Sequence, residues 1–150
     1  GLKKDIQENF RAYATGGHRH LPEIGQLLNE LYGSPLKINF LPHLIPAMRG
    51  IYSTMYVNFS DPIKKNFEEI YKEFYKDSPN IKLMEKNQVP ETAQVSYTNN
   101  CQIGIYNSAI ETQVIIISSI DNLIKGAAGQ AIECYNLMCG NNQMEGLENG

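Results

Sequence analysis

The chain has 150 residues, of which 42% are hydrophobic and 19% are charged, and its formal net charge at pH 7 is −3. This length and apolar content suit one domain with its own core and leave little room for a second. The slight acidic excess and the scattered Lys and Arg argue against nucleic-acid binding, and no apolar run approaches the roughly 20 residues that span a bilayer. We therefore expect a cytoplasmic protein that binds neither nucleic acid nor membrane.

The three cysteines, Cys101, Cys134 and Cys139, are odd in number and lack C-x-x-C spacing. Neither a disulfide framework nor a zinc finger is indicated, and a reducing compartment fits. The N-terminal residues include no apolar segment typical of a signal peptide. Because the chain opens with a lone glycine before Leu2, we expect it to be a fragment of a longer protein.

The first third of the chain predicts two strands and a helix before a long strand. A weak alternation over residues 9–14 favours a strand that leads into a glycine turn. A helix is predicted from Pro22 to Gly33, because apolar residues recur there at helical spacing, and this apolar stripe should face a core. A short strand is predicted at Lys37–Phe40, and β-branched and aromatic residues predict a long strand at Arg49–Phe59.

The rest of the chain predicts an antiparallel sheet with two more helices. Ser60 and Pro62 are typical of an N-cap and a first helical turn, so an amphipathic helix should start there. The strand candidates that follow are Ile81–Met84, Ala93–Tyr97, Cys101–Tyr106 and Thr112–Ser118. The continuous apolar run Val114–Ile117 indicates a strand covered on both faces. A final helix is predicted over residues 121–139, stopped by Gly140, so the fold class should be α+β with a mostly antiparallel sheet.

The final predicted helix carries Gly126 and Gly129 in its first half. Glycine in a helix interior costs about 1 kcal/mol relative to alanine, so each position needs a compensating contact. Close approach of a flat ligand and tight packing of the helix on the sheet would each supply one.

Candidate chemistry concentrates in residues 16–24, where two imidazoles, a guanidinium and a carboxylate precede a helix. Glu23, in the first helical turn, is placed to hydrogen-bond His18 or His20. Such a bond would fix the tautomer and raise the basicity of the ring, as a general acid/base requires. The alternative is that His20 only caps the helix and His18 is a solvated loop residue.

Three separated segments, residues 17–24, 40–50 and 119–131, carry a further signal. Together, and in this order, they resemble the N-acetyl-gamma-glutamyl-phosphate reductase family of the semialdehyde dehydrogenase superfamily. The resemblance implies that residues 1–150 form a single C-terminal catalytic and dimerisation domain, built like the catalytic domain of glyceraldehyde phosphate dehydrogenase. The final helix, residues 121–139, would then pack on an N-terminal Rossmann domain that binds NADP.

The activity that this resemblance implies is an oxidoreductase step of arginine biosynthesis. It converts N-acetyl-glutamyl 5-phosphate to N-acetyl-glutamate 5-semialdehyde plus phosphate at the expense of NADPH. The chain contains no G-x-G-x-x-G and no Gly-Cys-Tyr motif, so the dinucleotide fingerprint and the nucleophilic cysteine should lie elsewhere in the enzyme. We expect the fragment alone to be inactive, and Cys101, in a strand region, is not the nucleophile.

The resemblance also implies roles for individual residues. His18 corresponds to the acid/base, Glu23 orients it, and His20 lines the substrate pocket. Arg19 and Arg49 are both candidates for binding the substrate carboxylate or phosphate, since a guanidinium matches either anion. The residues expected near the cofactor are Asn122, Gly126 and Gly129. The implied partners are the acyl phosphate substrate, the Rossmann domain and a second copy in a homo-oligomer, and no metal is implied.

A second hypothesis, of another class, is a non-enzymatic binding or assembly module. In that case His18, His20, His43 and Glu23 would be candidate metal ligands. Their spacing matches no recognised zinc pattern. Stoichiometric zinc in the purified protein would favour this hypothesis over the catalytic role of the histidines.

Overall fold

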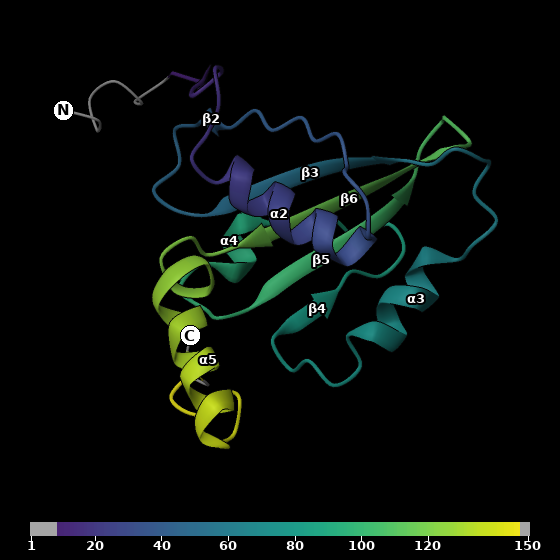
Figure 1. Cartoon of the computed structure of the whole chain (residues 1–150). Helices are drawn as coiled ribbons and strands as arrows, with labels where there is room; N and C mark the ends of the chain where they lie inside the picture. The colour runs from purple at the N-terminus through teal and green to yellow at the C-terminus, as the bar shows by residue number, and fades with distance from the viewer. Residues whose placement is uncertain (1–8, 148–150) are drawn as a thin grey trace. The chain divides into compact units, whose positions relative to one another are not determined.

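The computed structural model describes residues 9–147, and the chain divides into two compact units, Gly1–Met48 and Arg49–Gly150 (Figure 1). The first unit contains β1 (Arg11–Ala12), α2 (Leu21–Tyr32) and β2 (His43–Leu44). The second contains a four-stranded sheet, β3-β6-β5-β4, with its helices. No helix within residues 9–147 has the length and apolar character needed to cross a membrane.

The helix predicted in the first unit is confirmed. It ends at Gly33, which adopts a φ of 79° in the left-handed region and donates its N–H to the Asn29 carbonyl oxygen. Glycine suits this position because it has no Cβ to clash. The predicted strand at Lys37–Phe40 is wrong, since those residues are irregular and antiparallel pairing begins only at His43, opposite Ala12.

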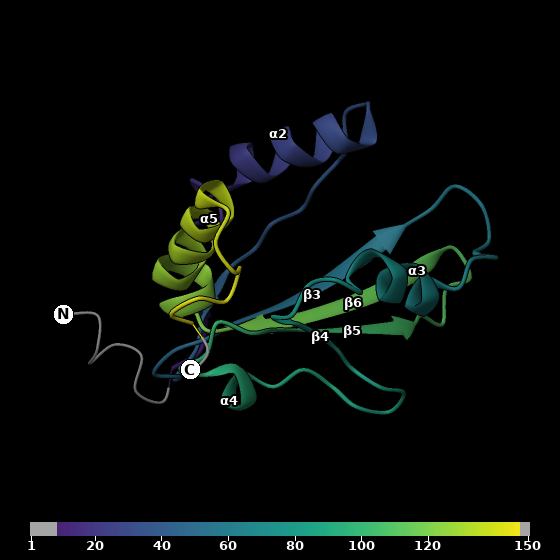
Figure 2. The same cartoon turned by 90° about the horizontal axis from the view of Figure 1, so that it is seen from below.

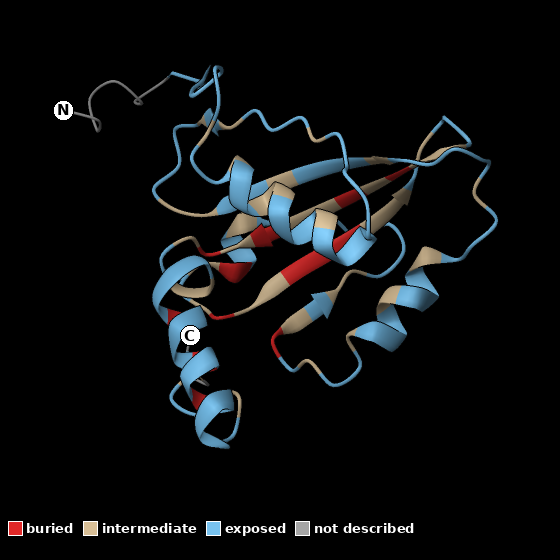
Figure 3. Cartoon of the chain, viewed as in Figure 1, coloured by how far each residue is buried: buried red, intermediate tan, exposed pale blue. Residues whose placement is uncertain are grey.

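The first unit has no core of its own, because no residue between 9 and 48 is buried (Figure 3). The apolar stripe of α2 is largely exposed, with Leu27 at 54% and Leu31 at 85%. The expectation that this stripe faces a core therefore fails within the described residues.

The sheet of the second unit is formed by β3 (Ile51–Asn58), β6 (Gln113–Ile120), β5 (Cys101–Asn107) and β4 (Ile81–Leu83). The β3–β6 and β6–β5 pairs are antiparallel, whereas β4 runs parallel to β5. Figures 1 and 2 show α3 near the end of the sheet where β3 and β5 finish, and α5 near the opposite end. The predicted α+β class with a mostly antiparallel sheet is confirmed.

The core of the second unit lies between α3 (Phe67–Phe74) and one face of the sheet. Ile103, Val114 and Ile116 are its buried centre, and Phe67 and Tyr71 of α3 pack against them. Apolar burial of this kind is the main favourable term in folding. Val114 and Ile116 point to this face, while the alternate residues Ile115 and Ile117 are half-buried, so within residues 9–147 the second face of this strand is covered only in part.

Two predicted boundaries in this unit are wrong for tertiary reasons. The helix expected at Ser60–Pro62 begins at Phe67, because the Ile63 N–H is engaged by the Glu111 carbonyl oxygen. Asn66 caps the helix instead, its Oδ1 accepting from the Glu68 and Glu69 N–H groups.

The strand predicted at Ala93–Tyr97 is also wrong, because this segment forms the one-turn helix α4 (Thr92–Val95) with Val95 buried. Both edges of β5 are paired, with β6 and β4, so this segment cannot pair beside the strand that follows it.

The predicted final helix is confirmed in outline but starts later and in another form. It consists of a π-helical turn, η1 (Ile124–Ala128), followed by α5 (Gly129–Cys139) and a left-handed Gly140. Asp121 lies before the helix and caps it, its Oδ1 accepting from the Leu123 N–H at 2.8 Å and the Ile124 N–H at 3.0 Å.

Candidate functional site

The histidine turn of the first unit lies directly before α2, as predicted. His20 occupies the N-cap position, and its carbonyl oxygen accepts the Ile24 N–H at 2.9 Å. The turn itself depends on Gly17, whose φ of 130° is a conformation that residues with a Cβ rarely adopt. The His18 carbonyl oxygen accepts the Leu21 N–H at 2.9 Å, which closes the loop onto the helix.

The His18 imidazole is held at both nitrogens. Its Nδ1 accepts the backbone N–H of His20 at 3.2 Å, and its Nε2 lies 3.4 Å from the Tyr13 hydroxyl. Because a backbone N–H can only donate, Nδ1 is the unprotonated nitrogen and the neutral ring carries its proton on Nε2. The rings of His20 and Phe40 each pack edge-on against the His18 ring, with centroids 4.8 and 5.3 Å from its centroid. The arrangement can therefore donate a proton from Nε2.

The other predicted residues of this turn are exposed. Glu23 lies in the first turn of α2, and within residues 9–147 it forms no hydrogen bond with His18 or His20. Arg19 is likewise exposed and has no ion-pair partner in that part of the chain. Across the same residues, no group of three His, Cys, Asp or Glu side chains gathers in a metal-binding arrangement.

Arg49, the other candidate for anion binding, belongs to the second unit and is already paired. Its guanidinium contacts Asp121, with Nε 2.7 Å from Oδ2 and the terminal nitrogen 2.9 Å from Oδ1. It also stacks 4.0 Å from the centroid of the Tyr97 ring. The hydrogen bond that Arg49 donates to the Asp121 carboxylate raises the pKa of Arg49. A bidentate pair of this kind occupies the fork that an external anion would need.

Asp121 is fully buried. Burial would raise the pKa of its carboxyl group, but the hydrogen bond from Arg49 and the backbone N–H groups of Tyr97, Leu123 and Ile124 outweigh it and lower the pKa to about 2. The carboxylate therefore stays charged at neutral pH, and it joins the start of β3 to the start of the final helix.

The three predicted cofactor residues follow this carboxylate in the chain, and they differ in their contacts and exposure. Asn122 accepts the Gly50 N–H on Oδ1 at 2.6 Å, which leaves its amide N–H₂ end without a partner in residues 9–147. Gly126 is exposed, and a Cβ there would meet nothing closer than 3.4 Å. Gly129 is buried, and a Cβ there would collide with the Asn99 side chain. Tight packing therefore accounts for Gly129, whereas Gly126 is open to a ligand.

A buried polar cluster around Glu133 escaped the sequence analysis. Its Oε2 accepts from Lys125 at 2.6 Å, from Asn80 at 2.7 Å and from Asn99 at 2.9 Å, while Gln143 donates to Oε1 at 2.6 Å. Burial opposes the charge, but these hydrogen bonds outweigh it and lower the pKa of Glu133. No spacing rule connects residues so far apart, so the sequence offered no signal.

Cys101 is not set up as a nucleophile. Its thiol is half-buried in β5, and burial raises its pKa despite the nearby Lys125. The thiolate is the reactive form of cysteine, so this environment disfavours attack. The structure supports the sequence interpretation of Cys101.

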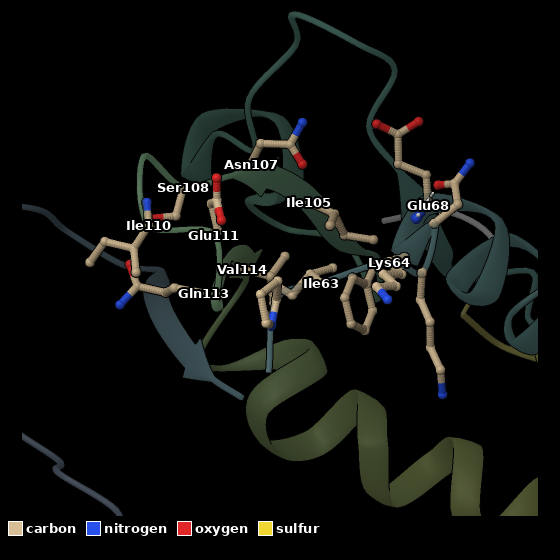
Figure 4. Close-up of a pocket in the computed structure, with 14 residues that line it drawn as sticks. Ile63, Lys64, Glu68, Ile105, Asn107, Ser108, Ile110, Glu111, Gln113 and Val114 are labelled. Carbon is tan, nitrogen blue, oxygen red and sulfur yellow. Dashed lines mark hydrogen bonds between the residues drawn. The ribbon is translucent and has the colours of Figure 1, made fainter. Parts of the chain in front are cut away.

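An open hollow of about 710 Å³ lies at the end of the sheet next to α3 (Figure 4). Residues 62–68, which include Ile63, form one wall. The other wall comes from β5, β6 and their connection and includes Val114. None of the predicted site residues lines it. The chemistry of the candidate site thus lies outside this hollow.

The fold of this chain is also found in solved structures of semialdehyde dehydrogenases. A probable aspartate-semialdehyde dehydrogenase from Pseudomonas aeruginosa superposes with a TM-score of 0.69 at 19% identity, over 89% of this chain and 42% of that one. The aspartate semialdehyde dehydrogenase from Francisella tularensis gives 0.68 at 16% identity, over 89% and 40%. At these identities the likeness shows the fold alone, the α+β fold that part of each of these dehydrogenases also has.

Sequence comparison then gives the family. Residues 2–122 match the model of the semialdehyde dehydrogenase dimerisation domain, and the chain belongs to that family. A relative from Geobacter sp. (strain M21) is 46% identical over 146 residues and is called N-acetyl-gamma-glutamyl-phosphate reductase. The relative of the same name from Crocosphaera subtropica is 42% identical over 148 residues. These matches include 96% and 97% of this chain, which spans only 42% of the length of each relative.

Proposed function

We propose that this chain is the C-terminal catalytic and dimerisation domain of a longer, cytoplasmic, NADP-dependent reductase. The enzyme would convert N-acetyl-glutamyl 5-phosphate to N-acetyl-glutamate 5-semialdehyde and phosphate in arginine biosynthesis. The observation that carries the proposal is the His18–His20 turn before α2, which lies within the family match and holds an imidazole with a transferable proton. The relatives that bear the reductase name match the chain over nearly its full length.

The proposed reaction gives His18 a defined task. A cysteine thiolate from the remainder of the enzyme attacks the acyl carbon, the C–O bond to phosphate breaks, and a thioester forms. NADPH, bound mainly outside this chain, would supply the hydride that reduces the thioester carbonyl. His18, protonated when it takes the proton of that cysteine's thiol, then donates a proton to the oxygen that gains negative charge. When the adduct collapses to aldehyde and thiolate, the imidazole takes that proton back.

Arg19 is the better of the two candidates for holding the substrate anion. It is exposed and lies between His18 and His20 in the sequence, so its guanidinium is available near the acid/base. Arg49 is committed to Asp121. We therefore assign substrate binding to Arg19 and His20. The orientation of His18 by Glu23 stays a proposal from the resemblance, because no hydrogen bond joins the two within residues 9–147.

Asn122 and Gly126 fit a cofactor that approaches from outside the chain. The Asn122 amide has a free N–H₂ end, which can donate to a carbonyl or phosphate oxygen, and Gly126 exposes backbone without a side chain. Gly129 supports both by letting the helix pack on Asn99. The exposed face of α5, with Ile132, Tyr135 and Met138, would pack on the Rossmann domain.

A second copy of the chain would cover the sheet face that α3 leaves free. On that face Tyr52 and Tyr56 are 46% and 62% exposed, and Ile115 and Ile117 are half-buried. Aromatic residues around an apolar centre are typical of subunit interfaces. Sedimentation of the full-length enzyme should give a dimer or larger, and Tyr56→Lys should weaken it.

The activity is tested with the semialdehyde, phosphate and NADP, following NADPH formation. The full-length enzyme should show phosphate-dependent turnover, and the 150-residue chain alone should show none. Phosphate-dependent turnover by the chain alone would contradict its dependence on the rest of the enzyme. Failure of the full-length enzyme with this substrate would overturn the proposed function.

A further inference from the structure

We propose that Asp121 is a positioning residue for the dinucleotide site, and that Arg49 serves as its counter-ion and not as a substrate ligand. The inference rests on the proposed function, because it concerns the cofactor residues Asn122 and Gly126. Its basis is the network of contacts around one buried carboxylate.

Asp121 gathers three segments that lie far apart in the sequence. Arg49, at the start of β3, forms the bidentate ion pair with Oδ1 and Oδ2. The Tyr97 N–H, after α4, donates to Oδ2 at 2.7 Å, and the Leu123 and Ile124 N–H groups donate to Oδ1. These last two residues directly follow Asn122, so the carboxylate fixes the backbone on both sides of it.

The Asn122 side chain forms a second link between this segment and the start of β3. The Asn122 Oδ1 accepts the Gly50 N–H at 2.6 Å, while Arg49, one residue earlier, is held by Asp121. Gly50 has a φ of 111°, and a Cβ there would lie 3.0 Å from the Thr92 side chain, so no other residue fits easily. The Asn122 amide is thereby oriented with its donor end outward.

The Tyr97 backbone shows that this arrangement is imposed by its surroundings. Tyr97 adopts a φ of 67°, which is uncommon for a residue with a Cβ, yet its side chain is 65% exposed and buries little apolar surface. Tyr97 donates its N–H to Asp121 and places its ring against the Arg49 guanidinium. Strained residues of this kind persist where the surrounding contacts determine their conformation, and they cluster at functional sites.

Glu133 provides a matched comparison within the same unit. It is also buried, also carries a lowered pKa and also pairs with a cation, Lys125. All its hydrogen-bond donors are side chains, whereas Asp121 binds backbone N–H groups beside Asn122. A purely structural role for Asp121 would make the two carboxylates equivalent in their effect on the cofactor.

The test uses Asp121→Asn and Glu133→Gln in the full-length enzyme, with dinucleotide binding measured by titration and by steady-state kinetics. Asp121→Asn should raise the Kd and KM for the dinucleotide by about tenfold, since one displaced hydrogen-bond donor has an effect of that order. Its kcat at saturation should change by less than about threefold. Glu133→Gln should lower the Tm about as much as Asp121→Asn does, and it should leave the Kd and KM for the dinucleotide within about twofold of the wild-type values.

Arg49 variants keep the proposal testable if Asp121→Asn fails to fold. Arg49→Met should raise the dinucleotide KM, and Arg49→Lys, which keeps the charge but loses the fork, should restore part of it. A rise in the acyl phosphate KM alone would overturn the proposal and return Arg49 to the substrate. Equal changes in dinucleotide affinity for the Asp121 and Glu133 variants would also overturn it. Either result needs an active wild-type enzyme, so it is distinct from failure of the proposed function.

Discussion

The two units of this chain divide chemistry from stability. Residues 9–48 hold the imidazole turn, yet none of them is buried. Residues 49–147 hold the apolar core of Ile103, Val114 and Ile116 and two buried carboxylates, each with an ion pair. A reactive side chain needs access to substrate, whereas a buried charge needs a complete set of partners. The difference predicts that substitutions in the first unit mainly change rate, and that substitutions in the second unit mainly change folding, apart from those beside the proposed cofactor residues.

The largest expected effect is on rate, from His18→Asn in the full-length enzyme. We expect kcat/KM to fall about 10²- to 10⁴-fold, because that is the contribution of a positioned acid/base. The Tm should hardly change, since the ring lies in a unit without a core. The control is His43→Asn, which removes an imidazole stacked on Phe10 and should cost less than about fivefold. Equal losses for the two histidines would contradict the assigned role.

The largest expected effect on folding is that of Glu133→Leu. It leaves the amides of Asn80 and Asn99 and the Lys125 ammonium without their acceptor in a buried site. Removing one partner of a buried ion pair costs about 3–5 kcal/mol. Urea denaturation of the 150-residue chain measures this. A loss below about 1 kcal/mol would mean that the cluster is solvated in solution.

A smaller effect separates the two helix glycines. Gly129→Ala should destabilise the chain by about 1–3 kcal/mol, because its Cβ would collide with Asn99. Gly126→Ala is the matched control, since its Cβ has room and alanine favours the helix by about 1 kcal/mol. Opposite signs in thermal denaturation are therefore expected. Destabilisation by both would show that the π-helical turn itself requires glycine.

The smallest effect is a pH dependence of the second unit. The pKa of Asp121 is about 2 in the folded chain, against an ordinary value of 3.8 for this carboxyl group. A depressed folded pKa contributes stability above the unfolded value, and this stability is lost as pH falls from about 4 towards 2. Acid denaturation followed by circular dichroism should show this loss, and Asp121→Asn should reduce its slope. An unchanged slope in the variant would contradict the lowered pKa.

Local signals in the sequence predicted the elements that depend on nearby residues alone. The helix that ends at Gly33, the strands β3, β5 and β6, and the stop at Gly140 follow from periodicity and backbone preference. Residues 93–97 have the composition of a strand, but β5, the strand that follows them, already has both of its edges paired. A single sequence does not reveal which edges are already occupied.

The candidate site was predictable only in part, for a similar reason. The turn of His18 and His20 is contiguous, so its composition reveals it, and the structure adds the tautomer and the contact with Tyr13. The partnership of Arg49 with Asp121 joins residues 72 positions apart. The sequence could offer Arg49 as a free cation, and only the fold shows that its charge is already balanced.

The π-helical turn sets the rotational phase of the terminal helix. In η1 the Gly126 N–H donates to the Asp121 carbonyl oxygen, five residues back, so the turn takes up about one extra residue. Each residue of an α-helix advances the side-chain direction by about 100°. Without the extra residue, every side chain of α5 would be rotated by roughly that angle, and Glu133 would face away from Asn80 and Asn99. The length of one turn thus decides which face of α5 contacts the segments before β4 and β5 and which face stays exposed.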